Sequence, residues 1–577
     1  MSLKRKYDYY DQYCNEDEDD YEYKKIKFNE LLFTNDYIRL ILSFLDRNFI
    51  FRTCSLISKQ FREQAINTPV VLYIEKKENL DRIRNLPNPL NITELNTVNK
   101  VIDDVLDWIF HHPLKHLKKL RIKRLFWGSM EDEHVERLCS MPALSTLTLL
   151  HLEPISMTNK GCSFIANCEY FQNLTEFSLR NSKCNEKGAE LIVRSKYMSK
   201  LTSLSFRRNN FRTIEGVLSS PLFLQVKKLD LSDCSIKKLI FPQVMPLLED
   251  LDLSLNKFGT NNVVTALTRT RNLTKLNLYD VELDRDGLKH MVENHYLSKL
   301  TDLDVDHVAV TSDMLEYIVS SQYFKQLKFL NLESTLIGND GCIVLAENEN
   351  MRNLTSLTLG SRYYACFITL NGLCHIFHSR NMSNLQVLSL KGLNLVDKTE
   401  NFDFSMGKHF GDMLVKSSFG KNLKSVKLIE CHLKMVDVQS IAQLDGLTKL
   451  NITHYNPIDT VCECIASSSH MSNLTSLTLS CKVKDSGCVA LANSIYLTQL
   501  ATLNLSFNEI GNDGCEYIVN SPNFPNLTSL DMTGNNKMNH IALKMIQHSP
   551  HFKNLKRSFV HFLTILNESE EIRLNNG

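Results

Sequence analysis

The chain has 577 residues, with 66 lysines and arginines against 65 aspartates and glutamates, so its formal net charge is +1. A balance this close to neutral excludes bulk attraction to nucleic acid or to anionic membranes, and any recognition must depend on local patches. No apolar run reaches the ~18 residues that span a bilayer. We therefore expect neither nucleic acid nor a membrane as a partner.

The N-terminal residues and the cysteine content bear on the compartment. Met1–Asp11 begins with basic residues, but no apolar core follows, so we expect no secretory signal. The 16 cysteines of such a chain indicate free thiols in a reducing compartment. We expect the protein in the cytoplasm, the nucleus or both.

The first two segments differ sharply in composition. Residues 1–27 are rich in tyrosine and acidic residues and poor in aliphatic ones, so we expect a disordered tail. In residues 28–68, apolar residues at helical spacing run from Ile38 to Leu45, and a second such stripe runs from Ile50 to Phe61. A few short helices cannot bury a sizeable core alone, so this segment needs a partner surface.

Residues 69–116 join this helical segment to a long repeat. Val70–Ile74 is expected to form a strand, and residues 99–110 an amphipathic helix. We interpret this region as an N-terminal cap or as degenerate first repeats, which cover the exposed end of a repeat array.

An L-x-x-L-x-L cassette recurs sixteen times through residues 117–554. Its leading position falls at 117, 144, 174, 201, 226, 248, 273, 300, 327, 354, 385, 423, 447, 474, 500 and 527. A period near 27 residues with this pattern indicates a leucine-rich repeat solenoid. We therefore predict an α/β fold with a curved parallel sheet inside and helices outside, closed by a C-terminal cap and tail over residues 555–577.

Two further positions of the repeat carry a pattern. Three residues after the last strand leucine stands a small residue that can hydrogen-bond the turning backbone: Asn209, Cys234, Asn256, Thr335, Cys431, Asn508 and Asn535. About nine residues after the same leucine a glycine precedes a helical run: Gly188, Gly287, Gly341 and Gly514. Each unit is therefore expected to run strand, turn, helix.

Two units are longer than the rest. The leading positions 354 and 385 lie 31 residues apart, and 385 and 423 lie 38 apart. Insertions in a solenoid map to loops on one face, which is often the binding face.

The helical segment has a specific resemblance. Residues 33–45, FTNDYIRLILSFL, and 52–62, RTCSLISKQFR, resemble the two halves of an F-box, and a leucine-rich solenoid follows them as in F-box/leucine-rich-repeat proteins. Phe33-Thr34 stands where the family favours Leu-Pro, and Phe61 where it favours Trp. The resemblance covers about 35 residues.

The resemblance implies a non-catalytic substrate receptor of a Skp–cullin–F-box ubiquitin ligase. Its F-box would bind a Skp-type adaptor and thereby a cullin, and its repeats would bind a protein substrate. The candidate adaptor contacts are Phe33, Ile38, Ile41, Leu42, Phe44, Leu45, Ile50, Leu56, Ile57 and Phe61, some of which must pack within the F-box itself.

The third, fifth and seventh positions of each cassette face outward from the strands and are the candidate substrate contacts. A basic cluster comes first, followed by an acidic stretch: Arg180, Arg207 and Arg208, then Asp230, Asp250, Asp252, Asp302, Asp304 and Asp306. After Leu354 the same positions become neutral. Three aspartates on alternate positions of one strand repel one another unless a basic partner or an ion relieves them. A docking site for a basic segment and a merely solvated strand face both remain open.

No cofactor, metal or catalytic site is expected. The run from Cys366 and Cys374 to His375 and His378 has no zinc-ligand spacing, and Cys462 and Cys464 form a bare C-x-C. No phosphate loop, zincin motif or nucleophile elbow occurs. Two alternatives to the ligase subunit stay open: a free-standing scaffold or inhibitor resembling ribonuclease inhibitor, and a GTPase-activating solenoid resembling the Ran activator.

Overall fold

A computed structural model of the chain describes residues 69–74, 77, 80–81, 91–98, 101–112, 114–123, 130–153, 156–361, 367–395, 409–454, 460–549, 551 and 557–559. The predicted tail over 1–27 and the F-box-like segment over 28–68, with all the candidate adaptor contacts, lie outside these residues. Residues 362–366 and 396–408, in the two longer units that begin at 354 and 385, also lie outside them.

The chain divides into two compact units, one comprising residues 1–154 and 168–174 and the other residues 155–167 and 175–577. In its described residues, the first unit contains four parallel strands paired in chain order: β1 Val70–Ile74, β2 Ile92–Val98, β3 Lys119–Lys123 and β4 Leu149–Leu152. Its helices are α8 Ile102–His111, α9 Asp132–Cys139, and the 3-10 turns η3 Pro142–Leu144 and η4 Glu169–Phe171.

The first unit confirms the predicted strand at Val70–Ile74 and the helix near residue 102, and it adds the unpredicted strand β2. Leu95 in β2 pairs with Leu120, so the repeat pattern of strands begins before residue 117. The predicted leading position of the second cassette, residue 144, is wrong by three residues. Leu120 pairs with Leu150, which makes Leu147 the leading leucine, because Leu144 ends η3 instead.

The second unit contains parallel strands that pair with their neighbours in chain order from β5 to β19. They are β5 Glu176–Leu179, β6 Ser203–Ser205, β7 Lys228–Asp230, β8 Asp250–Asp252, β9 Lys275–Asn277, β10 Asp302–Asp304, β11 Phe329–Glu333, β12 Ser356–Gly360, β13 Val387–Lys391, β14 Ser425–Ile429, β15 Lys449–Thr453, β16 Ser476–Ser480, β17 Thr502–Asn504, β18 Ser529–Asp531 and β19 Arg557–Phe559.

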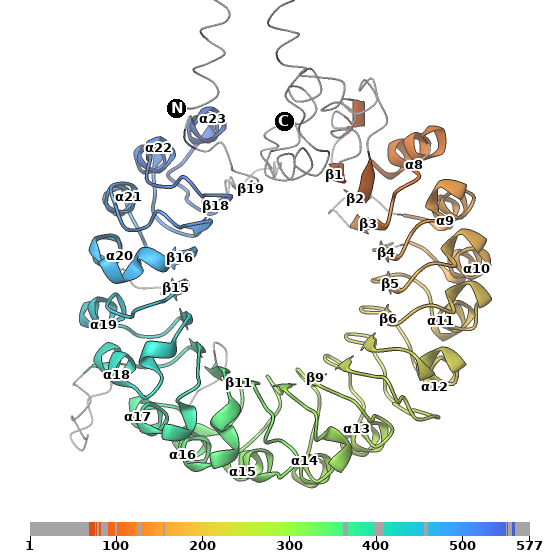
Figure 1. Cartoon of the computed structure of the whole chain (residues 1–577), viewed down its shortest axis with the longest axis horizontal. Helices are drawn as coiled ribbons and strands as arrows, with labels where there is room; N and C mark the ends of the chain where they lie inside the picture. Colours follow the sequence, from red (N-terminus) through yellow and green to blue (C-terminus); the bar gives the residue numbers. More distant parts are fainter. Residues whose placement is uncertain are drawn as a thin grey trace, which may run out of the picture. The chain divides into compact units, whose positions relative to one another are not determined.

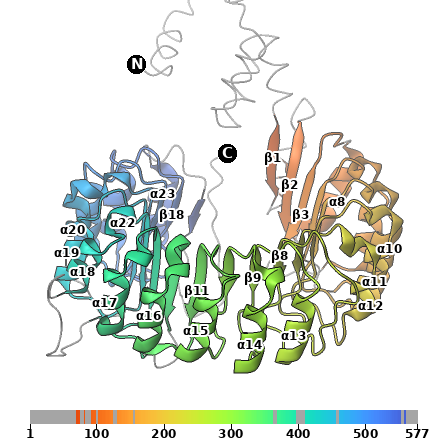
Figure 2. The same cartoon turned by 60° about the horizontal axis from the view of Figure 1, so that its bottom comes forward.

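Helices of the second unit form a layer outside these strands (Figure 1, and turned in Figure 2). They are α10 Asn159–Asn167, α11 Glu186–Val193, α12 Glu215–Leu218, α13 Thr260–Leu267, α14 Arg285–Val292, α15 Ser312–Ser320, α16 Gly338–Glu347, α17 Leu370–His378, α18 Phe410–Lys416, α19 Met435–Ile441, α20 Val461–Ser467, α21 Asp485–Ala492, α22 Asn512–Asn520 and α23 His540–His548. The 3-10 turns are η5 Lys196–Met198, η6 Pro221–Leu224, η7 His295–Leu297, η8 Glu349–Asn353, η9 Arg380–Met382, η11 Gly420–Asn422 and η12 Ser469–Asn473. The predicted order of strand, turn and helix is confirmed.

The strand leucines and the predicted small polar residues share the core between the two layers. Asn256 is completely buried. Its Nδ2 donates to the carbonyl oxygens of Leu231 at 2.8 Å and Leu253 at 3.0 Å, and its Oδ1 accepts from the backbone N–H groups of Cys234 and Ile236. The equivalent side chains Asn209 and Asn508 bond in the same way. The prediction that this position serves the turning backbone is confirmed.

The glycine near each helix start allows adjacent units to pack closely. A Cβ on Gly287 would lie 1.5 Å from Cγ2 of Thr260 in the preceding unit. The same residue donates its N–H at 2.8 Å to Asp284, the N-cap of α14. Stacking and helix capping therefore both depend on this position. Within the described part of the chain, no helix is long and apolar enough to cross a membrane.

Candidate functional site

We use the term strand face for the side chains at the third, fifth and seventh cassette positions on β5–β18 of the second unit. Because adjacent strands pair in register, each cassette position forms a column of side chains that runs across the sheet. Neighbours in a column are about 4.8 Å apart, close enough for one side chain to contact the next. The column positions therefore show which predicted residues the fold brings together.

The fifth column combines carboxylates with hydroxyl and amide groups. In strand order it reads Ser205, Asp230, Asp252, Asn277, Asp304 and Asn331. Ser205 donates to Asp230 at 2.8 Å, Asn277 to Asp252 at 3.0 Å, and Asn331 to Asp304 at 3.1 Å. From β7 to β11 this column carries three negative charges and no positive one, so it is the acidic part of the strand face.

The third column is different, because lysines that the sequence analysis overlooked alternate with its aspartates. In strand order it reads Lys228, Asp250, Lys275 and Asp302. Lys275 Nζ lies 3.8 Å from Asp302 Oδ1. This column is neutral overall, so the acidic stretch expected to include Asp250 and Asp302 is narrower than predicted. The signal was present in the sequence, since both lysines occupy the third cassette position.

Burial affects the acidity of these carboxyl groups. Burial raises the pKa of Asp252 and of Asp304 above the ordinary range, although hydrogen bonds from Ser254, Asn277 and Asn331 oppose the rise. Burial also raises the pKa of Asp250, where the charges of Lys228 and Lys275 oppose it. The protein thus holds part-buried carboxylates that a cationic ligand would favour in their charged form.

The three aspartates in and after β10 form hydrogen bonds within the chain. Asp302 accepts a hydrogen bond from Thr301 Oγ1 at 2.6 Å, and Asp306 Oδ1 lies 2.6 Å from His307 Nδ1. With Asn331 bonded to Asp304, each of the three aspartates has a partner inside the protein. The three carboxylates therefore do not require a ligand for their stability, and their role in substrate binding stays a prediction.

An ion pair links two strands that are not neighbours. Lys391 at the end of β13 reaches Glu333 at the end of β11, across Gly360 of β12, which has no side chain to block the path. The Glu333 side chain is 8 % exposed and that of Lys391 is 23 % exposed. The pair lies in the seventh column, and the backbone N–H of His307, the residue after Asp306, donates to the carbonyl oxygen of Glu333.

Asp306 titrates in this environment. Burial raises its pKa to about 6, the charge of Glu333 adds to the rise, and the hydrogen bond and charge of His307 oppose it. The ring of His307 packs edge-on against Tyr279, with ring centres 5.0 Å apart. The strand face thus includes one carboxyl that changes charge in mildly acidic solution.

The fold only partly assembles the predicted basic cluster. Arg180 and Arg207 occupy the seventh position of adjacent units, and the backbone N–H of Asn181 donates to Arg207 O at 3.0 Å. Arg207 Nε is buried without a hydrogen-bond partner. Arg208, at a left-handed φ of 59°, turns to Asp233 and forms an ion pair at 3.1 Å. Arg208 is therefore already neutralised by its own chain.

Beyond β11 the strand face carries polar side chains at the predicted positions, including Ser356, Thr358, Ser476, Thr478, Thr502 and Asn504. It is not uniformly neutral, however. Lys427 of β14 and Lys449 of β15 are exposed in these columns, in addition to the paired Lys391. The expectation of a neutral far end is therefore wrong between β13 and β15.

The thiols and histidines form no metal site in the described part of the chain. Cys374 Sγ lies 3.5 Å from Met413 Sδ, and His378 Nδ1 lies 2.8 Å from the carbonyl oxygen of Cys374. Cys366 lies outside the described residues. Cys462 is buried, and burial raises the pKa of its thiol well above the ordinary range. Cys374 thus packs against the next repeat unit, and His378 bonds its own helix.

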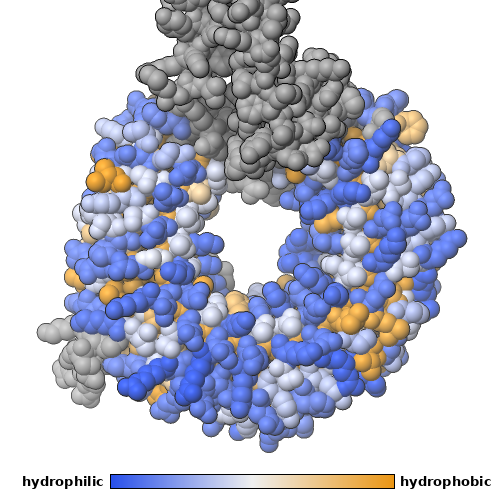
Figure 3. All heavy atoms as spheres, in the orientation of Figure 1, coloured by the Kyte–Doolittle hydropathy of each residue, from blue (hydrophilic) through white to orange (hydrophobic). Residues whose placement is uncertain are grey.

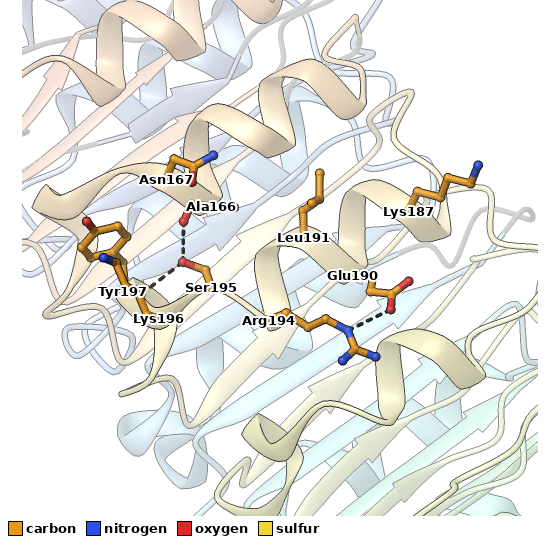
Figure 4. A pocket seen from close by; sticks show the side chains of 9 residues that line it. All are labelled: Ala166, Asn167, Lys187, Glu190, Leu191, Arg194, Ser195, Lys196 and Tyr197. Carbon is orange, nitrogen blue, oxygen red and sulfur yellow. Dashed lines mark hydrogen bonds and ion pairs between the residues drawn. The ribbon is translucent and has the colours of Figure 1, made fainter.

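The helix layer contains an open hollow of about 670 Å³ among α10, α11 and η5 (Figure 4). Its polar groups largely bond one another: Arg194 Nε donates to Glu190 at 2.8 Å, and Ser195 Oγ donates to the carbonyl oxygen of Ala166. Leu191 is 45 % exposed on its wall. No nucleophile and base meet among its lining residues, so the hollow suggests no catalytic function.

A comparison with known protein families matches one segment of the chain. Residues 497–519 match the family model described as Leucine Rich repeat. Similar solved structures include an internalin (inlF) from Listeria monocytogenes, at 17 % identity and a TM-score of 0.31, covering 69 % of this chain and 89 % of the internalin chain. Another is a protein from Bacteroides fragilis, at 18 % identity and a TM-score of 0.31, covering 43 % of this chain and 68 % of that one.

A comparison with curated proteins finds no match. The architecture is therefore assigned on the repeated cassette, on the in-register parallel strands with their outer helices, and on the matched repeat over 497–519. On these grounds, the chain carries leucine-rich repeats arranged as a solenoid.

Proposed function

We propose that this chain is a protein-binding subunit without catalytic activity, and that it serves as the substrate receptor of a Skp–cullin–F-box ubiquitin ligase in the cytoplasm or nucleus. The observation that carries the proposal is the order of two segments: an F-box-like stretch over 28–68, followed by a solenoid with a long polar strand face. The first segment would bind a Skp-type adaptor and the strand face a protein substrate.

The mechanism is one of proximity. A substrate lysine held near a charged conjugating enzyme reacts at a high effective concentration, so the receptor must bind the substrate but needs no catalytic group. The charged columns of the strand face supply contacts suited to binding a protein substrate. The acidic fifth column favours a substrate segment rich in lysine or arginine.

The adaptor part of the proposal is tested by Ile41→Asp combined with Leu42→Asp in the full chain. Two charges on the apolar stripe should abolish co-purification with a Skp-type adaptor and cullin, while the circular dichroism of the solenoid stays unchanged. Ile495→Asp is the matched control, because Ile495 is a lone apolar side chain 71 % exposed on the solenoid. Undiminished adaptor binding by the double variant would leave a free-standing repeat scaffold as the function.

The substrate part is tested with a lysine-rich peptide of about 12 residues as the probe. Changing Asp230, Asp252 and Asp304 to asparagine removes the fifth-column charge while keeping a hydrogen-bonding side chain at each position. Affinity should fall at least tenfold, which is about 1.4 kcal/mol. The control variant carries Glu282→Gln, Asp286→Asn and Glu316→Gln. These residues are exposed outside the strand face, and their replacement changes the net charge by the same amount. Equal losses in both variants would reject a specific role for the fifth column.

A further inference from the structure

In the described part of the second unit, the helix layer is interrupted between α12 and α13. The leading positions 226 and 248 lie 22 residues apart, fewer than the usual 27, and none of residues 231–249, all described, is helical. The preceding helix α12 has only four residues, whereas the following helix α13 has eight. The unit between β7 and β8 therefore contributes no helix to the outer layer.

An extended segment occupies the place of the missing helix. Lys238 bridges to Thr213 of the unit before, and Met245 to Thr270 of the unit after. Gln243 Nε2 also donates to the carbonyl oxygens of the preceding unit, at 3.1 Å to Leu218. A helix with its side chains is ~10 Å across, and a single extended segment is thinner. The outer layer is therefore shallow here, although its backbone is held on both sides.

The extended segment exposes apolar side chains. Leu239 and Phe241 point into the core and are buried, while the alternating residues Ile240, Pro242 and Val244 remain partly or fully accessible. Leu247 is 42 % exposed and Leu224 of the preceding unit 48 % exposed. Figure 3 shows hydrophobic residues gathered over this part of the unit. We use the term outer patch for Leu224, Ile240, Pro242, Val244, Pro246 and Leu247.

Exposed lysine and arginine side chains surround the outer patch. Lys237 and Lys238 are exposed at its start, and Lys257 and Arg269 of the next unit are exposed beside it. The acidic side chains nearby are Glu215 of α12, which is exposed, and Asp233 and Glu249, which form ion pairs with Arg208 at 3.1 Å and with Lys227 at 3.3 Å. An apolar surface with a basic rim fits an apolar ligand that carries negative charge at its edges.

We propose that the outer patch binds an amphipathic helix of a partner protein, whose apolar stripe covers Ile240, Val244 and Leu247 and whose acidic residues face Lys237 and Lys238. A helix restores the missing thickness of the layer and buries apolar area along its length. An added strand is disfavoured because β7 and β8 are already paired on both sides. A second copy of this chain would bring two basic rims together, which repel each other.

The test uses the full chain and a designed helical peptide of about 16 residues, with leucine at i, i+3, i+4 and i+7 and glutamate at most other positions. Fluorescence anisotropy should show binding at least tenfold tighter than that of a peptide of the same composition with the leucine stripe scrambled. Ile240→Asp should weaken the intact peptide at least tenfold, and Ile495→Asp should leave its affinity unchanged.

Charge reversal provides a second variant that does not disturb packing, since Lys237 and Lys238 are exposed. Lys237→Glu with Lys238→Glu should weaken the glutamate peptide and strengthen a version with lysine in place of glutamate. Equal affinity for the striped and scrambled peptides, or indifference to both variants, overturns the proposal. A dimer in sedimentation that Ile240→Asp abolishes would also overturn it, in favour of a second copy. The result is independent of adaptor binding.

Discussion

Lys391 and Glu333 form an ion pair although 58 residues and an intervening strand separate them. The pair is possible because Gly360, which lies between them in the seventh column, has no side chain. Glu333 is almost completely buried, so Lys391 supplies the charge that compensates it. The ion pair thus links the C-terminal ends of β11 and β13 across β12.

Replacing the lysine of this pair should be costly. Lys391→Met leaves the Glu333 carboxylate buried without its counter-charge, and we expect a loss of about 3 kcal/mol of stability in urea unfolding at neutral pH. Lys427→Met, at an exposed position of the next strand, is the control and should cost less than ~0.5 kcal/mol. Similar losses for the two variants would show that the pair does not stabilise the fold.

Gly360 should tolerate no side chain. Its φ is +98°, and a Cβ would lie 2.0 Å from the backbone oxygen of Lys391. We expect Gly360→Ala to cost at least ~2 kcal/mol, since it combines backbone strain with a clash against β13. Gly259→Ala is the matched control, because a Cβ there has no atom within 4 Å and φ is −61°. Comparing the urea midpoints of the two variants tests the argument.

Asp306 should make stability depend on pH. Its pKa is raised from 3.8 to about 6 by burial and by the charge of Glu333. The folded state therefore holds this proton where the unfolded state has lost it. The stability that this raised pKa contributes is fully present below about pH 4, is lost as the pH rises through about 6, and is absent well above that. Asp306→Asn should remove this slope from the pH dependence of the urea midpoint, and an unchanged slope would contradict the assignment.

The buried asparagines should be essential for the turns. Asn256→Ala removes a buried side chain that bonds three backbone carbonyls and two backbone N–H groups. Each buried backbone group left without a partner costs about 1 kcal/mol or more, so we expect the free energy of unfolding to fall by at least ~3 kcal/mol. The control is Asn210→Ala, at the exposed residue that follows the buried Asn209, and it should change stability by less than ~0.5 kcal/mol. Thermal unfolding of both variants checks the difference.

The repeat was predictable from sequence because every unit faces the same physical demand. A leucine alternation of period two can only be buried by stacking parallel strands, and an unpaired turn needs a small polar side chain such as Asn209 or Asn508. The frame failed at 144, where leucines at 144, 147, 149, 150 and 152 fit more than one alignment. Pairing of Leu120 with Leu150 selects the alignment in the folded protein.

The strand face was only partly predictable. The sequence located Asp230, Asp252 and Asp304 on outward positions, but it did not show that Asn277 and Asn331 bond two of them. Those contacts depend on which residues become neighbours across the sheet, and that follows from the exact register of units with unequal lengths.

The solenoid, the order of strand, turn and helix, and the position of the polar face all follow from local periodicity and could be read from the residues alone. The pairing of charges, as in Lys391 with Glu333, and the interruption of the helix layer around Ile240 became visible in the folded chain. The physical reason is that charge pairing and surface thickness depend on neighbours in adjacent units, whose distance along the chain changes from one repeat to the next.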